Sequence, residues 1–191
     1  MTKFRGSVYL AVSVDGYIAD ADGGVAWLDD IEHDEADGDM GYGDLIESVD
    51  CIVMGSKSYR TVRGFDVPWP YTIPVIVLSS SPVDIPPELA ASVRHLNHSP
   101  AELAKILPAQ GVHRVYVDGG DTVRRFLRAG LVDKVTLTQI PVLLGSGISL
   151  FAGLDVHIPL IFESSTPFSN GLVQTTYRIE PPGPIDGGGA L

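Results

Sequence analysis

Short apolar runs separated by turn-forming residues recur along the chain and predict buried strands. The first run covers residues 7–14, which are rich in β-branched and aromatic side chains. Asp-Gly and Gly-Gly pairs between residues 15 and 38 predict that this segment is mostly loop. Further strands are predicted at residues 51–54, 73–78, 92–96, 114–118 and 135–144.

Helices are predicted between these strands. The first covers residues 40–48, and the second is capped by Ser56 or Ser58 and reaches Val62. The third has a clear start and stop, and the fourth has an apolar face. In the third helix, Ser99 and Glu102 form a capping box with Pro100 at the first helical position, and Pro108 ends the helix. The fourth helix carries Val123, Phe126 and Leu127 on one face and is capped by Gly130.

The residue pattern between 160 and 179 predicts a hairpin, with strands at 160–164 and 172–179 around an Asn170-Gly171 turn. Residues 1–180 therefore read as one α/β domain, and the Pro/Gly-rich residues 181–191 as a flexible tail. We expect a mostly parallel sheet of about eight strands, with helices on both faces and the antiparallel hairpin at one edge.

Composition and charge narrow the function. The chain has 191 residues and a net charge of −11, and thirteen of its 24 acidic residues lie between Asp15 and Asp50, where there is no Lys or Arg. No basic stripe could displace phosphate counterions, which argues against nucleic-acid binding. The single Cys51 excludes an intrachain disulfide, and no apolar run has the roughly 20 residues that cross a bilayer. We expect a cytoplasmic protein with no membrane partner. The spacing of its His residues does not suit a metal site.

Three junctions between a buried strand and small residues are candidates for ligand binding. They lie at residues 53–59, 78–80 and 117–122, and each brings free backbone N–H groups or hydroxyls to a strand end. Each is either an ordinary turn or part of a cleft for phosphates. The fingerprint G-x-G-x-x-G is absent, which disfavours a Rossmann site.

The same segments resemble a known family. The chain is similar to dihydrofolate reductases in fold, and more closely to the reductase domain of the bifunctional riboflavin-biosynthesis deaminase–reductase. The resemblance spans most of residues 7–180. It is carried by Ser13–Ala19, Ile52–Gly55 with Ser58 and Tyr59, Val75–Ser80, Val117–Gly120, and Ala129–Asp133 through Ile140–Gly145.

The resemblance implies a stand-alone NADPH-dependent reductase of a ribosylaminopyrimidine or pterin-like heterocycle. In such an enzyme the protein positions cofactor and substrate, while the cofactor supplies the chemistry. The cofactor residues implied are Ala11 and Ile18 beside the nicotinamide, Gly55, Ser56, Lys57 and Ser58 at the pyrophosphate, Ser79 and Ser80 at the adenosine end, and Gly119, Gly120, Asp121 and Thr122 over the middle.

Two positions depart from the families' patterns. Dihydrofolate reductases usually place Arg after the Met-Gly pair, where this chain has Ser56 and Lys57. Riboflavin-pathway reductases usually carry Lys where this chain has Tyr9, a candidate substrate-binding residue. The second difference points to a stand-alone relative with a changed substrate.

The candidate proton donors are Asp15 and Glu32, with Asp29 as a less favoured third. Asp15 lies in the family's turn at the mouth of the site, and it either serves catalysis or bonds its own backbone. Glu32 follows Trp27 by the spacing of the pterin-binding carboxylate in dihydrofolate reductases, although an acidic segment places some carboxylate at any spacing. Trp27 either stacks on the substrate ring or covers the core.

Two functions remain open at this stage. The first is the reductase, and the second is a nucleotide- or pterin-binding protein that keeps the fold without turnover. A homodimer is also predicted, because residues 135–140 and 142–144 read as long apolar strand edges that a monomer would leave exposed.

Overall fold

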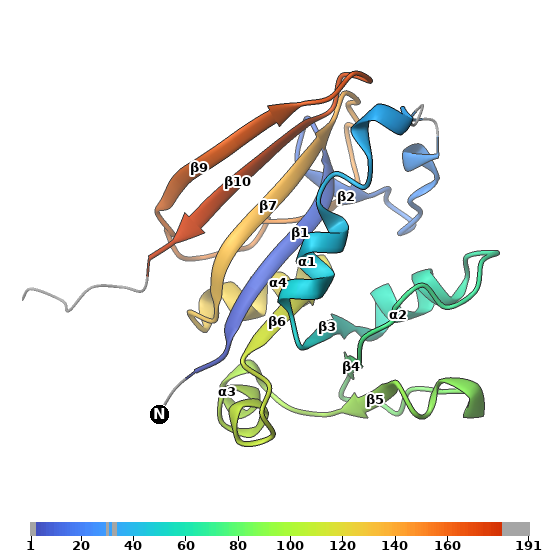
Figure 1. Ribbon diagram of the computed structural model, residues 1–191, viewed down its shortest axis with the longest axis vertical. Helices are drawn as coiled ribbons and strands as arrows, with labels where there is room; N and C mark the ends of the chain where they lie inside the picture. The colour runs from blue at the N-terminus through green and yellow to red at the C-terminus, as the bar shows by residue number, and fades with distance from the viewer. Residues whose placement is uncertain (1–2, 30, 32–33, 181–191) are drawn as a thin grey trace, which may run out of the picture.

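The computed structural model describes residues 3–29, 31 and 34–180 (Figure 1). Its centre is an eight-stranded sheet of order β5-β4-β3-β6-β1-β7-β10-β9. The strands from β5 to β7 are parallel, whereas β10 is antiparallel to both β7 and β9. The strands are β1 Arg5–Ser13, β3 Cys51–Gly55, β4 Val75–Leu78, β5 Val93–Leu96, β6 Arg114–Asp118, β7 Val132–Ile140, β9 Leu160–Pro167 and β10 Val173–Ile179.

Helices cover both faces of this sheet. On one face, α3 (Pro100–Ala109) and α4 (Gly120–Arg128) bury Leu103 and Phe126 in the larger core. On the other face, α1 (Tyr42–Ser48) and α2 (Ser56–Arg63) pack over β3, β4 and β6. The α/β, dihydrofolate reductase-like class expected from the sequence is therefore confirmed.

Several local expectations are confirmed. Ser99 and Glu102 form the capping box of α3, although that helix runs one residue past Pro108. Gly130 adopts a positive φ of 61° directly after the last turn of α4, as a C-terminal glycine does. The turn at Asn170-Gly171 connects β9 and β10.

Residues 15–38 are mostly loop, as expected, but they also contain short regular elements, and the expected cap of α2 is wrong. Residues 15–38 include a short strand, β2 (Tyr17–Ala19), which pairs with β8 (Ile148–Ser149) to form a separate two-stranded ribbon. The segment also includes the 3₁₀ turns Ala26–Leu28 and Glu35–Asp37, and a third 3₁₀ turn lies at Pro87–Leu89. Neither Ser56 nor Ser58 caps α2, because the helix starts at Ser56 with Gly55 as its N-cap.

The long strand near residue 140 also differs from the expectation. β7 starts at Val132 and ends before Pro141, and it is paired on one side with β1 and on the other with β10. It is therefore an interior strand, and the exposed edge inferred for residues 135–140 does not exist. The edge of the sheet on this side is β9.

The tail expected at 181–191 lies outside the described residues. Within the part of the chain that the structure describes, no helix is long and apolar enough to span a bilayer.

Candidate functional site

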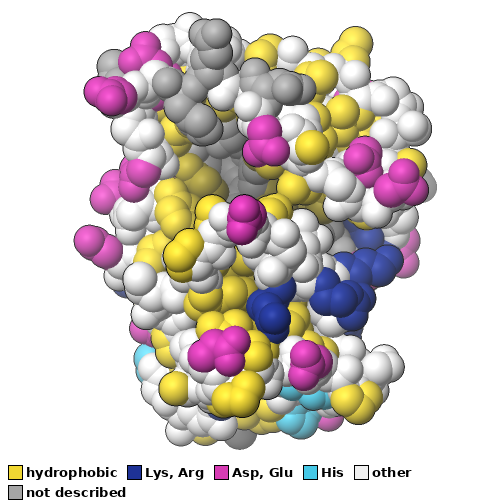
Figure 2. Space-filling view, turned by 90° about the vertical axis from the view of Figure 1, so that its right-hand side faces the viewer, with side chains coloured by type: hydrophobic (Ala, Val, Ile, Leu, Met, Phe, Trp, Pro, Cys, Tyr) yellow, Lys and Arg dark blue, Asp and Glu magenta, His cyan; other side chains and the backbone are white. Residues whose placement is uncertain are grey.

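A cleft of about 930 Å³ opens at the carboxyl ends of the parallel strands. β1, β3, β4 and β6 all end at this edge because they run in the same direction, and side chains or turns from their ends line the cleft. Figure 2 shows this face of the molecule, with Lys and Arg side chains gathered in one area beside the hollow. The cleft is thus the place where the chain's strand-end motifs meet.

Two glycine turns interlock at the centre of the cleft. The turn after β3 and the turn after β6 each place a glycine against a hydroxyl of the other helix's first turn. A Cβ on Gly55 would lie 3.1 Å from Thr122 Oγ1, and a Cβ on Gly119 would overlap Ser58 Oγ. Gly119 also has a φ of 86°, which L side chains rarely adopt. A side chain at Gly119 would have to displace Ser58, and one at Gly55 would force the Thr122 hydroxyl to shift slightly.

The first turns of α2 and α4 meet at this junction, and neither helix has a side-chain cap. The N-caps are Gly55 and Gly119, whose lack of a polar side chain leaves the first N–H groups without a side-chain acceptor. Three cations, Lys57, Arg60 and Arg125, also line this part of the cleft. Two positive helix ends with added cations suit the phosphates of a dinucleotide.

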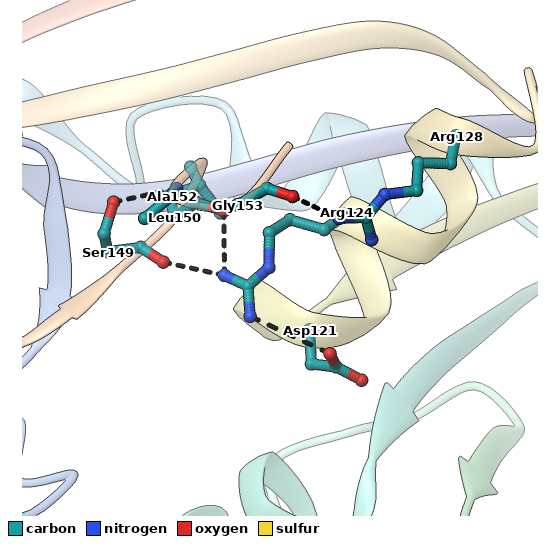
Figure 3. A network of polar contacts seen from close by, with 7 residues as sticks. All are labelled: Asp121, Arg124, Arg128, Ser149, Leu150, Ala152 and Gly153. Carbon is teal, nitrogen blue, oxygen red and sulfur yellow. Dashed lines mark hydrogen bonds and ion pairs between the residues drawn. The ribbon is translucent and has the colours of Figure 1, made fainter. Parts of the chain in front are cut away.

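Arg124 lines the same region but has a structural task (Figure 3). Its Nη1 donates to the carbonyl oxygens of Ser149 at 2.8 Å and Leu150 at 3.2 Å, and its Nη2 lies 3.8 Å from Asp121 Oδ1. One turn later, Arg128 donates to the Gly153 carbonyl. These bonds tie α4 to the β8 segment, so Arg124 fixes the ribbon that closes one side of the cleft.

Small and apolar side chains form the other half of the cleft. Ala11 comes from β1, Ile18 from β2, Leu28 from the first 3₁₀ turn and Ile148 from β8. A Cβ on Gly120 would lie 2.9 Å from Ile18 Cδ1, so this wall begins directly beside the glycine junction. Such a surface suits a planar ring next to the phosphate-binding turns.

Asp118 is a cleft residue whose carboxyl has a raised pKa. It ends β6, and burial raises the pKa of its carboxyl to about 6, against an opposing effect of the Gly119 N–H. Its negative charge contributes to the raised pKa values of Tyr42, Tyr71 and Tyr116, after burial as the main cause. A carboxyl that is partly protonated near neutral pH, in a cleft, is suited to proton transfer.

The structure brings together most of the predicted cofactor residues. Ten of the twelve line the cleft, and the exceptions are Ser79 and Ser80, which follow the lining residue Leu78. The Ser79 carbonyl accepts a bond from His95 Nε2 at 2.8 Å, and its hydroxyl accepts one from the Ser81 N–H. The ten are Ala11, Ile18, Gly55, Ser56, Lys57, Ser58, Gly119, Gly120, Asp121 and Thr122.

One of the two predicted catalytic residues, Asp15, lies outside the cleft lining. Its carboxylate accepts bonds from the Ser13 hydroxyl and from the backbone N–H groups of Leu144 and Gly145. The Ser13 bond, followed by the two backbone bonds, lowers the pKa of this exposed carboxyl. Asp15 thus links two distant loops as a stable anion. Glu32 lies outside the described residues.

The predicted substrate residues are also set back from the cleft lining. The Tyr9 hydroxyl donates to the Met40 carbonyl at 2.9 Å and accepts from Gln174 Nε2 at 2.9 Å, so it holds the loop before α1. Trp27 lies beside the lining residue Leu28, and its buried indole Nε1 has no hydrogen-bond partner among the described residues.

Sequence reasoning missed Asp118 and Tyr71 as site residues. Asp118 was part of a recognised glycine motif, yet its raised pKa depends on burial that only the fold creates. The signal available was an acid directly after the apolar run of β6, at a strand end. Across the described residues, no group of His, Cys, Asp and Glu side chains is arranged to hold a metal ion.

Comparisons with known proteins agree with this geometry. The family model of the RibD C-terminal domain matches residues 7–174. The chain is 31% identical over 167 residues to the uncharacterized protein YwjB of Bacillus subtilis, covering 86% of this chain and 92% of YwjB. A crystal structure from Shewanella sp. PV-4, named as a candidate riboflavin biosynthesis protein, superposes with a TM-score of 0.86 at 35% identity and covers 92% of this chain and 98% of that one.

Two more distant structures share the fold. A deaminase/5-amino-6-(5-phosphoribosylamino)uracil reductase from Thermotoga maritima has a TM-score of 0.68 at 18% identity and covers 93% of this chain and 57% of that one. Dihydrofolate reductase from Enterococcus faecalis, complexed with NADP(H), has a TM-score of 0.60 at 17% identity and covers 92% and 96%.

Proposed function

Because the chain belongs to the RibD C-terminal domain family, we propose that it is an NADPH-dependent reductase of a ribosylaminopyrimidine or pterin-like heterocycle. The observation that carries the proposal is the junction of Gly55 and Gly119, where two uncapped helix ends meet at the centre of a cleft. One side of this junction is cationic and the other is apolar. That division matches a cofactor with phosphates at one end and a ring at the other.

The residues present fit NADPH. Ser56–Ser58 and Gly119–Thr122 would hold the pyrophosphate with backbone N–H groups, because no Cβ occupies the space at the two glycines. Ala11 and Ile18 would pack against the nicotinamide. When bound, the cofactor supplies a hydride to the carbon of a C=N or C=O bond in the substrate.

The chain's own contribution to such a reduction is orientation and a proton. The β2–β8 ribbon, held by Arg124, fixes the apolar wall against which two rings can be aligned. The protonated Asp118 carboxyl can donate to the nitrogen or oxygen of the bond being reduced, and the raised pKa keeps part of the population protonated near neutral pH.

Cofactor preference provides a test of this function. Lys57 and Arg60 lie on the phosphate side of the cleft near the end of β4, so NADPH should bind about ten- to a hundredfold more tightly than NADH. Lys57→Gln should narrow that ratio, whereas Lys105→Gln, on α3 away from the cleft, should leave it unchanged. Equilibrium titrations of both cofactors measure the ratio. Equal dissociation constants in the wild-type protein would count against the proposed cofactor.

The homodimer predicted from the sequence is now proposed to form through the edge strand β9 rather than through the interior strand β7. β9 ends the sheet, and its Phe162 and Leu160 side chains are 61% and 46% exposed. Pairing of two β9 strands would cover an edge that proteins rarely leave open. Light scattering should give about twice the chain mass of 20.4 kDa, and Phe162→Glu should give a monomer. Leu143→Glu, a change at a 72% exposed site, is the control; a monomeric wild-type protein would refute the dimer.

A further inference from the structure

The cations of this chain are distributed unevenly around the cleft. Of its Lys and Arg residues, those that line the cleft all lie on α2 or α4, namely Lys57, Arg60, Arg124 and Arg125. Arg63 and Arg128 belong to the same two helices, and Arg63 donates to the Tyr59 hydroxyl. The positive charge at this edge is therefore confined to the side where the two helix ends meet.

The remaining cations lie away from this edge. Arg5 and Arg114 begin the parallel strands β1 and β6, at the opposite end of the sheet from the cleft. Lys134 lies near the start of β7 and pairs in register with Arg178 of β10. Arg94 bonds Gln110 at the end of α3, a helix that also carries Lys105. None of these side chains lines the cleft.

The apolar half of the cleft is built on a segment with the opposite charge. Residues 15–50 contribute Ile18, Val25 and Leu28 to the lining, together with the acidic residue Asp22. The segment holds thirteen Asp and Glu and no Lys or Arg. A ligand group in this half would therefore meet a negative potential.

Neutral groups satisfy several of these carboxylates, so the negative charge is not cancelled locally. Asp20 accepts from the backbone N–H groups of Asp22 and Gly24, and Asp39 accepts from those of Gly41 and Gly43. Asp15 accepts from backbone N–H groups and a hydroxyl. These hydrogen bonds add no positive charge to the segment.

We infer that the apolar half of the cleft takes a heterocycle without a phosphate group, either neutral or positively charged. The inference rests on the proposed reductase function, in which the cofactor's phosphates occupy the cationic half. A phosphate on the second ligand would lie beside an acidic segment whose neighbouring cation, Arg124, already bonds the Ser149 and Leu150 carbonyls, and like-charge juxtaposition of this kind opposes binding.

The inference is tested with a matched pair of probes, 5-amino-6-(ribosylamino)uracil with and without its 5′-phosphate. Dissociation constants for both are measured on the NADPH-saturated protein by competition, and consumption of NADPH is followed in parallel. The unphosphorylated compound should bind about tenfold or more tightly, and the difference should shrink as salt screens the exposed carboxylates. Equal or tighter binding of the phosphorylated compound would overturn the inference, and so would failure of both to bind.

A pair of charge-reversal variants sharpens the test. Asp22→Lys places a cation in the cleft lining and should raise affinity for the phosphorylated probe about tenfold. Glu47→Lys makes the same change of charge in the exposed last turn of α1, outside the cleft, and should leave the preference unchanged. Equal effects of the two variants would show that only net charge matters and would contradict the inference.

The two proposals fail in different ways. If the phosphorylated probe consumes NADPH more efficiently, the reductase function stands and the inference is wrong. If the unphosphorylated probe binds more tightly but neither probe consumes NADPH, the charge inference stands and the reductase function loses its support.

Discussion

Asp118→Asn is expected to lower kcat by about 10²- to 10⁴-fold, which is the usual contribution of a positioned general acid. The carboxyl ends β6 inside the cleft, and burial raises its pKa to about 6. Since the protonated form donates, wild-type kcat/KM should fall as the pH rises through about 6. The variant keeps the size of the side chain but removes its acid, so this dependence should disappear. Turnover at the wild-type rate in Asp118→Asn would exclude the role.

The same substitution should stabilise the protein at neutral pH. A carboxyl whose pKa is raised in the folded state from 3.8 to about 6 favours folding fully below the ordinary pKa. That contribution is lost as the pH rises through the folded-state pKa, and the loss lowers the free energy of unfolding by up to about 3 kcal/mol. The Tm of Asp118→Asn should therefore exceed that of the wild type at neutral pH, and the gap should close in acid. Asp66→Asn, at an exposed position outside the cleft, should show no such trend.

Gly119→Ala should weaken NADPH binding by about a hundredfold or more, because the new Cβ would displace Ser58 from the first turn of α2. The positive φ of 86° adds a backbone strain of about 1–2 kcal/mol, which by itself lowers stability without touching the site. Gly111→Ala separates the two effects. Gly111 has a nearly equal φ of 82° and open space around its Cβ position.

Both glycine variants should therefore lose stability, Gly119→Ala the more because its Cβ also overlaps Ser58, but only Gly119→Ala should lose cofactor affinity. Thermal unfolding measures the first quantity, and titration with NADPH measures the second. Normal NADPH affinity in a folded Gly119→Ala protein would remove the glycine junction from the cofactor site. Equal loss of affinity in Gly111→Ala would show that strain, rather than contact, is responsible.

The features that sequence predicted well are those encoded by neighbouring residues. The capping box of Ser99 and Glu102 and the Gly130 helix end depend on a few adjacent side chains, and both are present. The strand-end motifs at 53–59 and 117–122 were also recognisable, because parallel strands bring their carboxyl ends to one edge.

The features that sequence missed depend on pairing between distant residues. β2 exists only because it pairs with β8, which lies about 130 residues further along the chain. β7 could not be distinguished from an edge strand, because its partner β10 follows after a long connection. The raised pKa of Asp118, on which its proposed acid role depends, comes from burial that only the fold creates. Ser56 was expected to cap α2, but Gly55 occupies that position and leaves the helix end open to the cleft.

The central claim, that this chain is an NADPH-dependent reductase, is tested most directly by the loss of NADPH absorbance in the presence of substrate. Wild-type protein should consume NADPH with a ribosylaminopyrimidine or a dihydropterin, and Gly119→Ala and Asp118→Asn should not. If the wild-type protein binds NADPH but consumes none with either class of compound, the reductase claim is contradicted. The chain would then be a nucleotide-binding protein on a reductase fold.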